Sequence, residues 1–190
     1  NSHFDRTRRA MDLIEALPVP VIAAVNGYAL GGGGEILLCC DHRVADERAQ
    51  IGWPQSRLGI IPAWNGIDRL VRDCGPRVAS RLMTTGERIT AQQALEHGIV
   101  DQIAKPDASL DDALAHATIL EAAAPMALRF TKQVIKATGS QSPGAVRELQ
   151  RDGVVVGAMH APRGMLEFWI DPESPYFKPE FAEDKEFVLY

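Results

Sequence analysis

Residues 20–35 read PVIAAVNGYALGGGGE, an apolar run followed by four consecutive glycines and an acid. The run from Val19 to Val25 is rich in valine and isoleucine, which is typical of a strand covered on both faces, as in a parallel sheet. Asn26-Gly27 ends the run, and the glycines lead into a helix of two to three turns. A glycine run between a strand and a helix lets backbone approach a ligand, and free N–H groups at a helix start attract negative charge.

Three interpretations of the glycine run follow from its position: phosphate binding, oxyanion stabilisation and close helix–strand packing. The sequence disfavours phosphate binding because Ile36 stands where a Gly-x-Gly-x-x-Gly motif would have its third glycine. A Lys-Ser or Lys-Thr pair of the P-loop type does not follow the glycines either. Oxyanion stabilisation and close packing therefore remain.

The rest of the chain predicts a few strands followed mainly by helices. An amphipathic helix is predicted over 4–17, and a second short strand is predicted at 43–45. We interpret 49–62 as an irregular loop that lines a pocket. Further helices and one strand-like run follow, at 66–72, 76–83, 90–98, 99–103 (strand-like), 109–123, from 125 onward and 142–159.

Local signals refine these helices. Thr90 with Gln93 predicts a capping box, and Pro125 opens a helix at its first position. Ser109 with Asp112 is interpreted as a further helix cap, and the tail over 171–190 is expected to wrap over a surface. Strand and helix units followed by helices favour a layered α/β core with a separate helical part.

Composition and charge exclude several classes of protein. The 190 residues are 46% hydrophobic and 24% charged, which fits one globular domain rather than a disordered chain. A net charge of −5 weighs against a nucleic-acid partner, and the sequence holds no apolar run long enough to cross a membrane. Adjacent Cys39 and Cys40 are expected to be buried thiols, which favours a reducing, cytoplasmic setting. The spacing of histidines and cysteines predicts no metal site.

Several segments together resemble one known family. Residues 20–35 and the segment CDHRVA at 40–45 resemble the signature of the enoyl-CoA hydratase/isomerase (crotonase) family. The likeness continues through segments that follow in the family's order, at 51–54, 58–62, 69–70, 85–91, 94–101, 127–132 and 163–168. The resemblance covers nearly the whole chain. It implies an α/β crotonase-like fold of the ClpP/crotonase class, a spiral of ββα units with a C-terminal helical trimerisation region.

The resemblance also implies a division of the chain and an assembly. Residues 1–104 would form the C-terminal part of the spiral core, and 105–190 would form the trimerisation region and tail. The family's N-terminal turns would precede Asn1, and the chain is expected to lack them. The expected assembly is a homotrimer or a dimer of trimers, that is, a hexamer.

The chemistry that the resemblance implies is stabilisation of a thioester enolate. The substrate would be an acyl-CoA of fatty acid metabolism, with no further cofactor. The Gly32 N–H would be one oxyanion donor, and the other would come from a segment before Asn1. The resemblance implies that Lys132 could contact a CoA phosphate, but its residue pattern favours a solvated helix face. The expected substrate-binding residues are Leu30, Gly31, Trp53, Pro54, Ile61, Trp64 and Asn65.

The acid–base residues depart from the family pattern at one position. Family hydratases use two glutamates, and Glu35 matches the first, although it also fits a plain acid at a helix start. The second glutamate should follow Pro54, but Gln55 stands there. Glutamine can orient a water by hydrogen bonds but cannot exchange protons near neutral pH. Trp53 and Trp64 would either narrow the acyl pocket or pack in loops.

Several activities stay open at this point. An enzyme of lyase or isomerase type with Glu35 as its main acid–base group is the leading hypothesis, and double-bond isomerisation needs only one proton shuttle. Decarboxylation or carbon–carbon bond chemistry on an acyl-CoA needs only the oxyanion hole. A catalytically poor acyl-CoA-binding or assembly subunit is an alternative of another class. A serine hydrolase using Ser56 is the weakest, because the sequence has no Gly-x-Ser-x-Gly elbow.

Overall fold

The structure is a computed structural model that describes residues 3–138 of the chain. The predicted helix over 142–159 and the tail over 171–190 lie outside the described residues. In the described part, short strands and helices alternate along the chain and the last two elements are helices. This order confirms the predicted α/β class.

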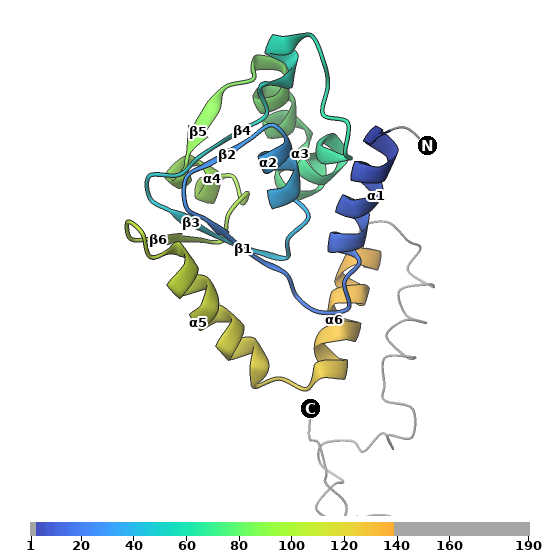
Figure 1. The fold of residues 1–190 in the computed structure, drawn as a ribbon, viewed down its shortest axis with the longest axis vertical. Coiled ribbons are helices and arrows are strands. Elements are labelled where there is room, and N and C mark those ends of the chain that lie inside the picture. Colours follow the sequence, from blue (N-terminus) through green and yellow to red (C-terminus); the bar gives the residue numbers. More distant parts are fainter. Residues whose placement is uncertain (1–2, 139–190) are drawn as a thin grey trace, which may run out of the picture. The chain divides into compact units, whose positions relative to one another are not determined.

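The described strands form two three-stranded sheets (Figure 1). The first sheet has the order β1-β3-β6, with β1 (Ile22–Val25), β3 (His42–Asp46) and β6 (Gln102–Ala104). The second has the order β2-β4-β5, with β2 (Tyr28–Leu30), β4 (Gln50–Gly52) and β5 (Arg88–Thr90). All neighbouring strands are parallel except β4 and β5, which are antiparallel.

The chain adds one strand to each sheet in every circuit. It passes from β1 to β2, turns through α2 (Gly32–Leu37), and returns to the first sheet as β3. Ile22 of β1 then lies opposite His42 of β3. In the same way, Tyr28 of β2 lies opposite Gln50 of β4. This repetition is the predicted spiral of two strands and a helix.

The predicted strands overlap observed ones but differ at their ends, and three observed strands were not predicted. The strand-like run predicted over 99–103 overlaps β6 only at residues 102–103. The strand predicted over 19–25 begins at Ile22, and the one predicted at 43–45 extends over 42–46. The segment 49–62 is not wholly irregular, because it contains β4 and a 3₁₀ helix, η1 (Pro54–Leu58). Strands of three residues are too short for a periodic pattern, so β2, β4 and β5 gave no signal.

Five further helices complete the described part of the chain. The ones not yet introduced are α1 (His3–Glu15), α3 (Gly66–Thr85), α4 (Ala91–Glu96), α5 (Ser109–Glu121) and α6 (Pro125–Thr138). Non-helical backbone at Gly75, with φ 78° and ψ 164°, interrupts α3 just before Pro76. The interruption confirms the two separate helical segments predicted there. Within residues 3–138, no helix is both long and apolar enough to cross a membrane.

The sequence predicted N-terminal caps for α4 and α5, and only the cap of α4 is present. The Thr90 and Gln93 side chains each bond the other's backbone N–H, so the predicted capping box of α4 is confirmed. The predicted cap at Ser109 is wrong: Ala108 is the N-cap residue of α5, and no side chain caps that helix. Ser109 is instead the first helical residue and is buried, so its pattern marked the right region but the wrong position.

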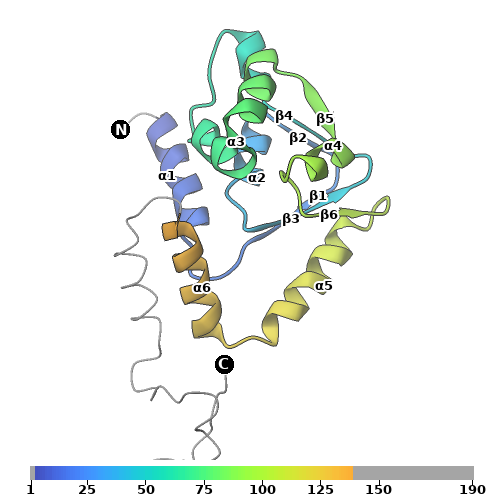
Figure 2. The ribbon, with the colours of Figure 1, turned by 180° about the vertical axis from the view of Figure 1, so that it is seen from behind.

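The main core lies among the two sheets, α3 and α4, and its fully buried members include Ile51, Leu70 and Leu82. A smaller cluster around Val44 lies under α5. Cys39 and Cys40 are buried as predicted, and burial raises the pKa of the Cys39 thiol to about 11. Figures 1 and 2 show α5 leading away from the sheets and α6 returning toward α1.

Candidate active site

Glu35 lies in the first turn of α2 and is 2% exposed. The glycines before it give the backbone a path that side chains would block. Gly31 has a φ of 56°, in the left-handed region that favours glycine. A methyl group on Gly32 would lie 2.5 Å from the Trp64 ring, and one on Gly34 would lie 2.9 Å from Trp53 Nε1. The glycine run therefore lets two indole rings pack against the start of α2.

The Glu35 carboxylate accepts hydrogen bonds from three donors. Gln55 Nε2 donates to Oε1 at 3.2 Å. The backbone N–H groups of Trp64 and Gly66 both donate to Oε2, at 2.9 and 3.1 Å. Gly66 is the first residue of α3, whose N-cap residue Asn65 makes no side-chain cap bond. Glu35 therefore supplies, from another helix, an acceptor that the start of α3 would otherwise lack.

Gln55 lies in η1, is 8% exposed and faces Glu35. Its Oε1 atom is buried and has no hydrogen-bond partner among the described residues. An amide in this position holds the carboxylate with its NH₂ group and keeps a free acceptor beside it. The arrangement can therefore orient a hydroxyl-bearing molecule next to Glu35.

The structure separates the two tryptophans that the sequence grouped together. Trp53 is fully buried in the main core, which matches the packing interpretation. Trp64 is half-buried, its ring lies against Gly32, and its backbone N–H donates to the Glu35 carboxylate. Trp64 is therefore the indole placed to shape a site over the start of α2. The Nε1 atoms of both rings are buried without a partner in the described part.

The remaining predicted site residues lie around this centre with different exposure. Leu30 and Gly31 form the junction between β2 and α2 and are partly buried, as is Pro54 at the start of η1. Ile61 is 72% exposed, and Asn65 is exposed with its Nδ2 donating to Asp12 Oδ1 at 3.1 Å. The structure thus brings together Gly32, Glu35, Gln55 and Trp64, whereas Ile61 points to solvent.

Ser56 is exposed at the surface of η1. Its hydroxyl makes no hydrogen bond to a histidine within residues 3–138. A Ser–His pair is the geometric signature of an activated serine. The geometry of the described residues therefore does not favour the serine-hydrolase alternative.

Lys132 of α6 is 8% exposed, which contradicts its interpretation as part of a solvated helix face. Its Nζ donates to Asp41 Oδ2 at 2.5 Å and to the Val19 carbonyl at 2.7 Å. Asp41 Oδ2 also accepts from the Val21 N–H, so Lys132 ties α6 to the segment before β3. The contact with a CoA phosphate stays a prediction.

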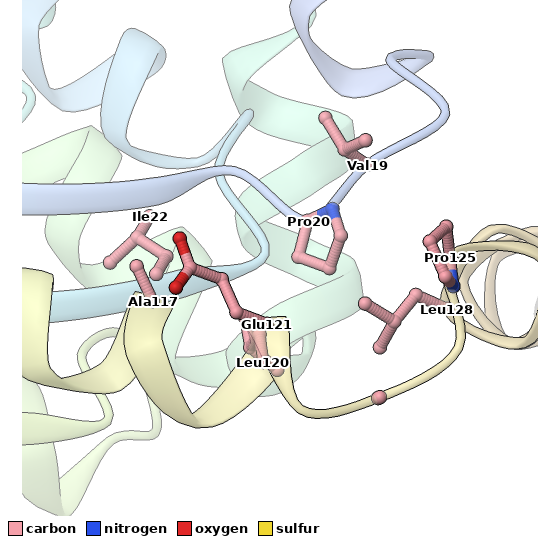
Figure 3. A pocket seen from close by; sticks show the side chains of 9 residues that line it. Val19, Pro20, Ile22, Ala117, Leu120, Glu121, Pro125 and Leu128 are labelled. Atoms are coloured by element: carbon pink, nitrogen blue, oxygen red, sulfur yellow. The ribbon is translucent and has the colours of Figure 1, made fainter.

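A cavity of about 360 Å³ lies apart from this centre, between α5, α6 and the segment before β1 (Figure 3). Its walls are almost entirely apolar, with Glu121 as the one charged side chain. The lining residues are Val19, Pro20, Ile22, Ala117, Leu120, Glu121, Ala123, Pro125 and Leu128. None of them is a predicted site residue. Within residues 3–138, no group of three or more potential ligands is placed to hold a metal ion.

Sequence reasoning assigned no role to Gly66 or Arg69, although both lie at the site. Gly66 must lack a side chain, because a methyl group there would lie 2.6 Å from Glu35 Cγ. Arg69 is 2% exposed and donates to the Trp64 carbonyl at 2.6 Å. An arginine one helical turn after a glycine does not by itself indicate a role in the site. Its carboxylate partners, Asp12 and Glu15 on α1, are distant in sequence, so no local pattern links them to it.

Comparison with known proteins links the described geometry to one family. A family model for enoyl-CoA hydratase/isomerase matches residues 5–167. The chain is 44% identical over 123 residues to 2,3-dehydroadipyl-CoA hydratase of Escherichia coli K12, covering 65% of this chain and 48% of that protein. It is 40% identical over 125 residues to crotonyl-CoA hydratase of Syntrophomonas wolfei, covering 66% and 48%. The chain thus spans about half the length of these curated relatives.

Solved structures give the same result for the fold. An enoyl-CoA hydratase from Bacillus anthracis matches with 35% identity and a TM-score of 0.78, covering 82% of this chain and 61% of that one. An enoyl-CoA hydratase from Polaromonas sp. JS666 matches with 34% identity and a TM-score of 0.77, covering 83% and 61%. These similarities confirm the predicted crotonase-like α/β fold.

Proposed function

The chain belongs to the enoyl-CoA hydratase/isomerase family, and on that premise we propose that it carries the acid–base centre of an enzyme acting on acyl-CoA thioesters. Glu35 is the proposed catalytic acid–base group, Gln55 its positioning partner, and the Gly32 N–H one oxyanion donor. The observation that carries the proposal is the buried contact of 3.2 Å between Gln55 Nε2 and Glu35 Oε1.

The two oxygens of Glu35 differ in their capacity to take a proton. A carboxylate offers about four lone-pair sites, two on each oxygen. Oε2 already accepts from two backbone N–H groups, whereas Oε1 accepts only from Gln55. We therefore assign Oε1 as the atom that exchanges protons with water or substrate.

A single carboxylate can serve hydration. As water oxygen bonds to C3 of a 2-enoyl thioester, Oε1 takes one water proton and the C2–C3 π electrons move toward the thioester oxygen. The Gly32 N–H would donate to that oxygen, and Glu35 would then return its proton to C2. The free Oε1 acceptor of Gln55 would hold the second hydrogen of the attacking water. Water is added, and Glu35 returns to its starting state.

The same centre can serve isomerisation of a 3-enoyl thioester. Glu35 would remove a proton from C2, the electrons would move onto the thioester oxygen, and the proton would be returned at C4. This reaction needs no water and no second carboxylate. Gln55 cannot exchange protons, so both reactions would use Glu35 alone. Gln55 therefore does not distinguish isomerisation from single-carboxylate hydration.

A second candidate function follows from the same contacts. The bonds from Trp64 and Gly66 give Glu35 the role of a structural acceptor at the start of α3. A chain in which that role dominates would bind an acyl-CoA with little turnover, or would use only the oxyanion hole for decarboxylation or carbon–carbon bond chemistry. In such a protein, replacing Glu35 by a residue that cannot exchange protons would leave activity unchanged.

One experiment separates these functions. The intact protein and its Glu35→Gln variant are assayed with crotonyl-CoA, a 3-enoyl-CoA and a malonyl-type thioester. Loss of general acid–base catalysis should lower kcat by about 10²–10⁴ for hydration or isomerisation, provided the variant remains folded. Undiminished turnover of every thioester by a folded variant would exclude Glu35 as the acid–base group.

The assembly and the division of the chain are also part of the proposal. We place the boundary after β6, so that 1–104 belongs to the spiral core and 105–190 to a trimerisation region. Apolar side chains exposed on α5 and α6, such as Leu110, Leu114 and Ile135, support an interface there. Sedimentation of the intact protein as a trimer or hexamer would agree with it, and a monomer at micromolar concentration would oppose it. A cytoplasmic location, with no nucleic-acid partner, stays part of this proposal.

A further inference from the structure

Arg69 of α3 is a buried cation whose guanidinium donates to three acceptors, two on α1 and one in the loop before α3. Nη1 donates to the Trp64 carbonyl at 2.6 Å. Nε donates to Glu15 Oε2 at 2.8 Å, and Nη2 donates to Asp12 Oδ1 at 2.7 Å. The two carboxylates belong to α1, whereas the carbonyl belongs to the loop that holds Glu35. The planar fork of arginine suits three acceptors in different directions better than an ammonium group does.

The segment Trp64–Gly66 bends at Asn65. Asn65 has a φ of 65°, a left-handed conformation that asparagine adopts more readily than most non-glycine residues. Its side chain bonds Asp12, the same residue that receives a bond from Arg69. The result of this bend is that the N–H groups on either side of Asn65 converge on one oxygen of Glu35.

The charges around Arg69 are matched. Burial raises the pKa of the Glu15 carboxyl, but hydrogen bonds and charge from Arg69 and Arg72 outweigh burial, and the net direction is down. Glu15 is therefore ionised near neutral pH and accepts the bond from Nε of the guanidinium. Asp12 is half-exposed, so its bond to Arg69 lies at the rim of the network.

We propose that Arg69, held by Asp12 and Glu15, is a positioning residue that sets the Trp64–Gly66 segment on the Glu35 carboxylate. Arg69 does not touch Glu35: it acts through the Trp64 carbonyl, and the two backbone N–H groups then orient the catalytic carboxylate. The catalytic consequence rests on the function proposed above, whereas the placement of Trp64 does not depend on it.

A plain structural bridge between α1 and α3 is the alternative role for Arg69. Arg72 provides the matched control, because it lies on the same helix and bonds the same Glu15, at 2.8 Å, without a bond to the loop. If Arg69 served only to bridge α1 and α3, variants of Arg69 and Arg72 would both reduce stability, by different amounts, and neither would act specifically on Trp64. If Arg69 positions the loop, only its variants would alter Trp64 and turnover.

The test uses the intact protein labelled with 5-fluorotryptophan, in wild-type form and as Arg69→Lys, Asp12→Ala and Arg72→Met. The three tryptophan resonances are assigned with Phe variants of Trp64 and Trp169. We expect Arg69→Lys and Asp12→Ala to shift the Trp64 resonance and leave that of the core residue Trp53 in place. Arg72→Met should move neither resonance.

The kinetic arm compares kcat and KM for a thioester that the wild-type protein turns over. Arg69→Lys should lower kcat at least about tenfold with KM changed less than about threefold, because a small misplacement of a catalytic group is costly in rate. An unmoved Trp64 resonance or an unchanged kcat in folded Arg69→Lys and Asp12→Ala would overturn the proposal, and so would equal movement of Trp53 and Trp64. Absence of turnover in the wild type would refute the proposed function alone, and the fluorine spectra would still decide the positioning.

Discussion

Gly66 lies against the side chain of Glu35 so closely that a methyl group on its Cα would be 2.6 Å from Glu35 Cγ. The contact joins the first turn of α3 to the first turn of α2, and the Gly66 N–H bonds Glu35 Oε2 across it. Gly66 itself lies in helix α3, so its backbone conformation does not demand glycine. Glycine is needed at 66 because the Glu35 side chain occupies the space that a Cβ would fill.

Replacing Gly66 by alanine should push Glu35 away from its donors. In a helix, alanine is normally favoured over glycine, but here the added methyl meets a buried side chain, and overpacking costs about 1–3 kcal/mol. We expect the free energy of unfolding in urea to fall by that amount and kcat to fall about tenfold or more. Gly33→Ala is the control, because a methyl group there meets nothing within 4 Å. Equal effects of the two variants would contradict the steric account.

Gln55→Glu should restore a second carboxylate beside Glu35. Two carboxylates at this separation repel when both are ionised, and burial strengthens the repulsion. We expect hydration of an enoyl-CoA to speed up relative to isomerisation, because a second proton-exchanging group becomes available. The variant should lose stability relative to the parent as the pH rises above the ordinary carboxyl range, about 4–5. Urea titrations at several pH values measure this difference, and a constant difference would count against the carboxylate contact.

Gly32 and Trp64 should show strong energetic coupling. A methyl group at Gly32 would lie 2.5 Å from the Trp64 ring, so Gly32→Ala alone forces the indole to move. Trp64→Ala removes the ring and should relieve the clash. In a double-mutant cycle of unfolding free energies we expect a coupling of at least about 0.5 kcal/mol. Additive effects would mean that the ring does not rest on Gly32.

Trp64→Ala should also widen the range of acyl chains that the protein accepts. The indole is the large side chain that lies against Gly32 at the start of α2, so its removal makes room there. We expect kcat/KM for long-chain enoyl-CoA thioesters to rise about tenfold relative to short ones. A parallel loss for all chain lengths would instead indicate that Trp64 matters only for holding the loop.

Glu15 should contribute to stability in a pH-dependent way. The pKa of its carboxyl is lowered in the folded protein, so the unfolded chain binds more protons in the acidic range. The ion pairs of Glu15 therefore raise the free energy of unfolding above the pKa of the unfolded chain, near 4.5. This stabilisation is lost as the pH falls through the lower pKa of the folded protein. Glu15→Gln should therefore flatten the acid side of the stability curve measured by urea unfolding. An unchanged slope would show that Glu15 titrates alike in both states.

Local chemistry predicted those elements that depend on neighbours in sequence. The Thr90–Gln93 capping box and the opening of α6 at Pro125 involve residues within one helical turn, and both were confirmed. Three-residue strands such as β2 exist only because a distant partner pairs with them, so no local pattern marked them. The cap assigned to Ser109 failed because the residue is needed in the buried interior of the first turn.

The sequence by itself determined the class of fold, the family and the chemical identity of the central pair. Glu35 after its glycines and Gln55 after Pro54 are both visible in the chain, and so is the absence of a second carboxylate. These features follow from residue types in order, and they need no knowledge of packing. The family resemblance added that the two residues should meet.

Only the tertiary structure decided how the pair is held. It placed Trp53 in the core and Trp64 over Gly32, turned Lys132 inward onto Asp41, and brought Arg69 to the Trp64 carbonyl. Each of these outcomes depends on which buried donor meets which acceptor across long separations in sequence. A side chain's own chemistry fixes what it can bond, but packing fixes which partner it finds.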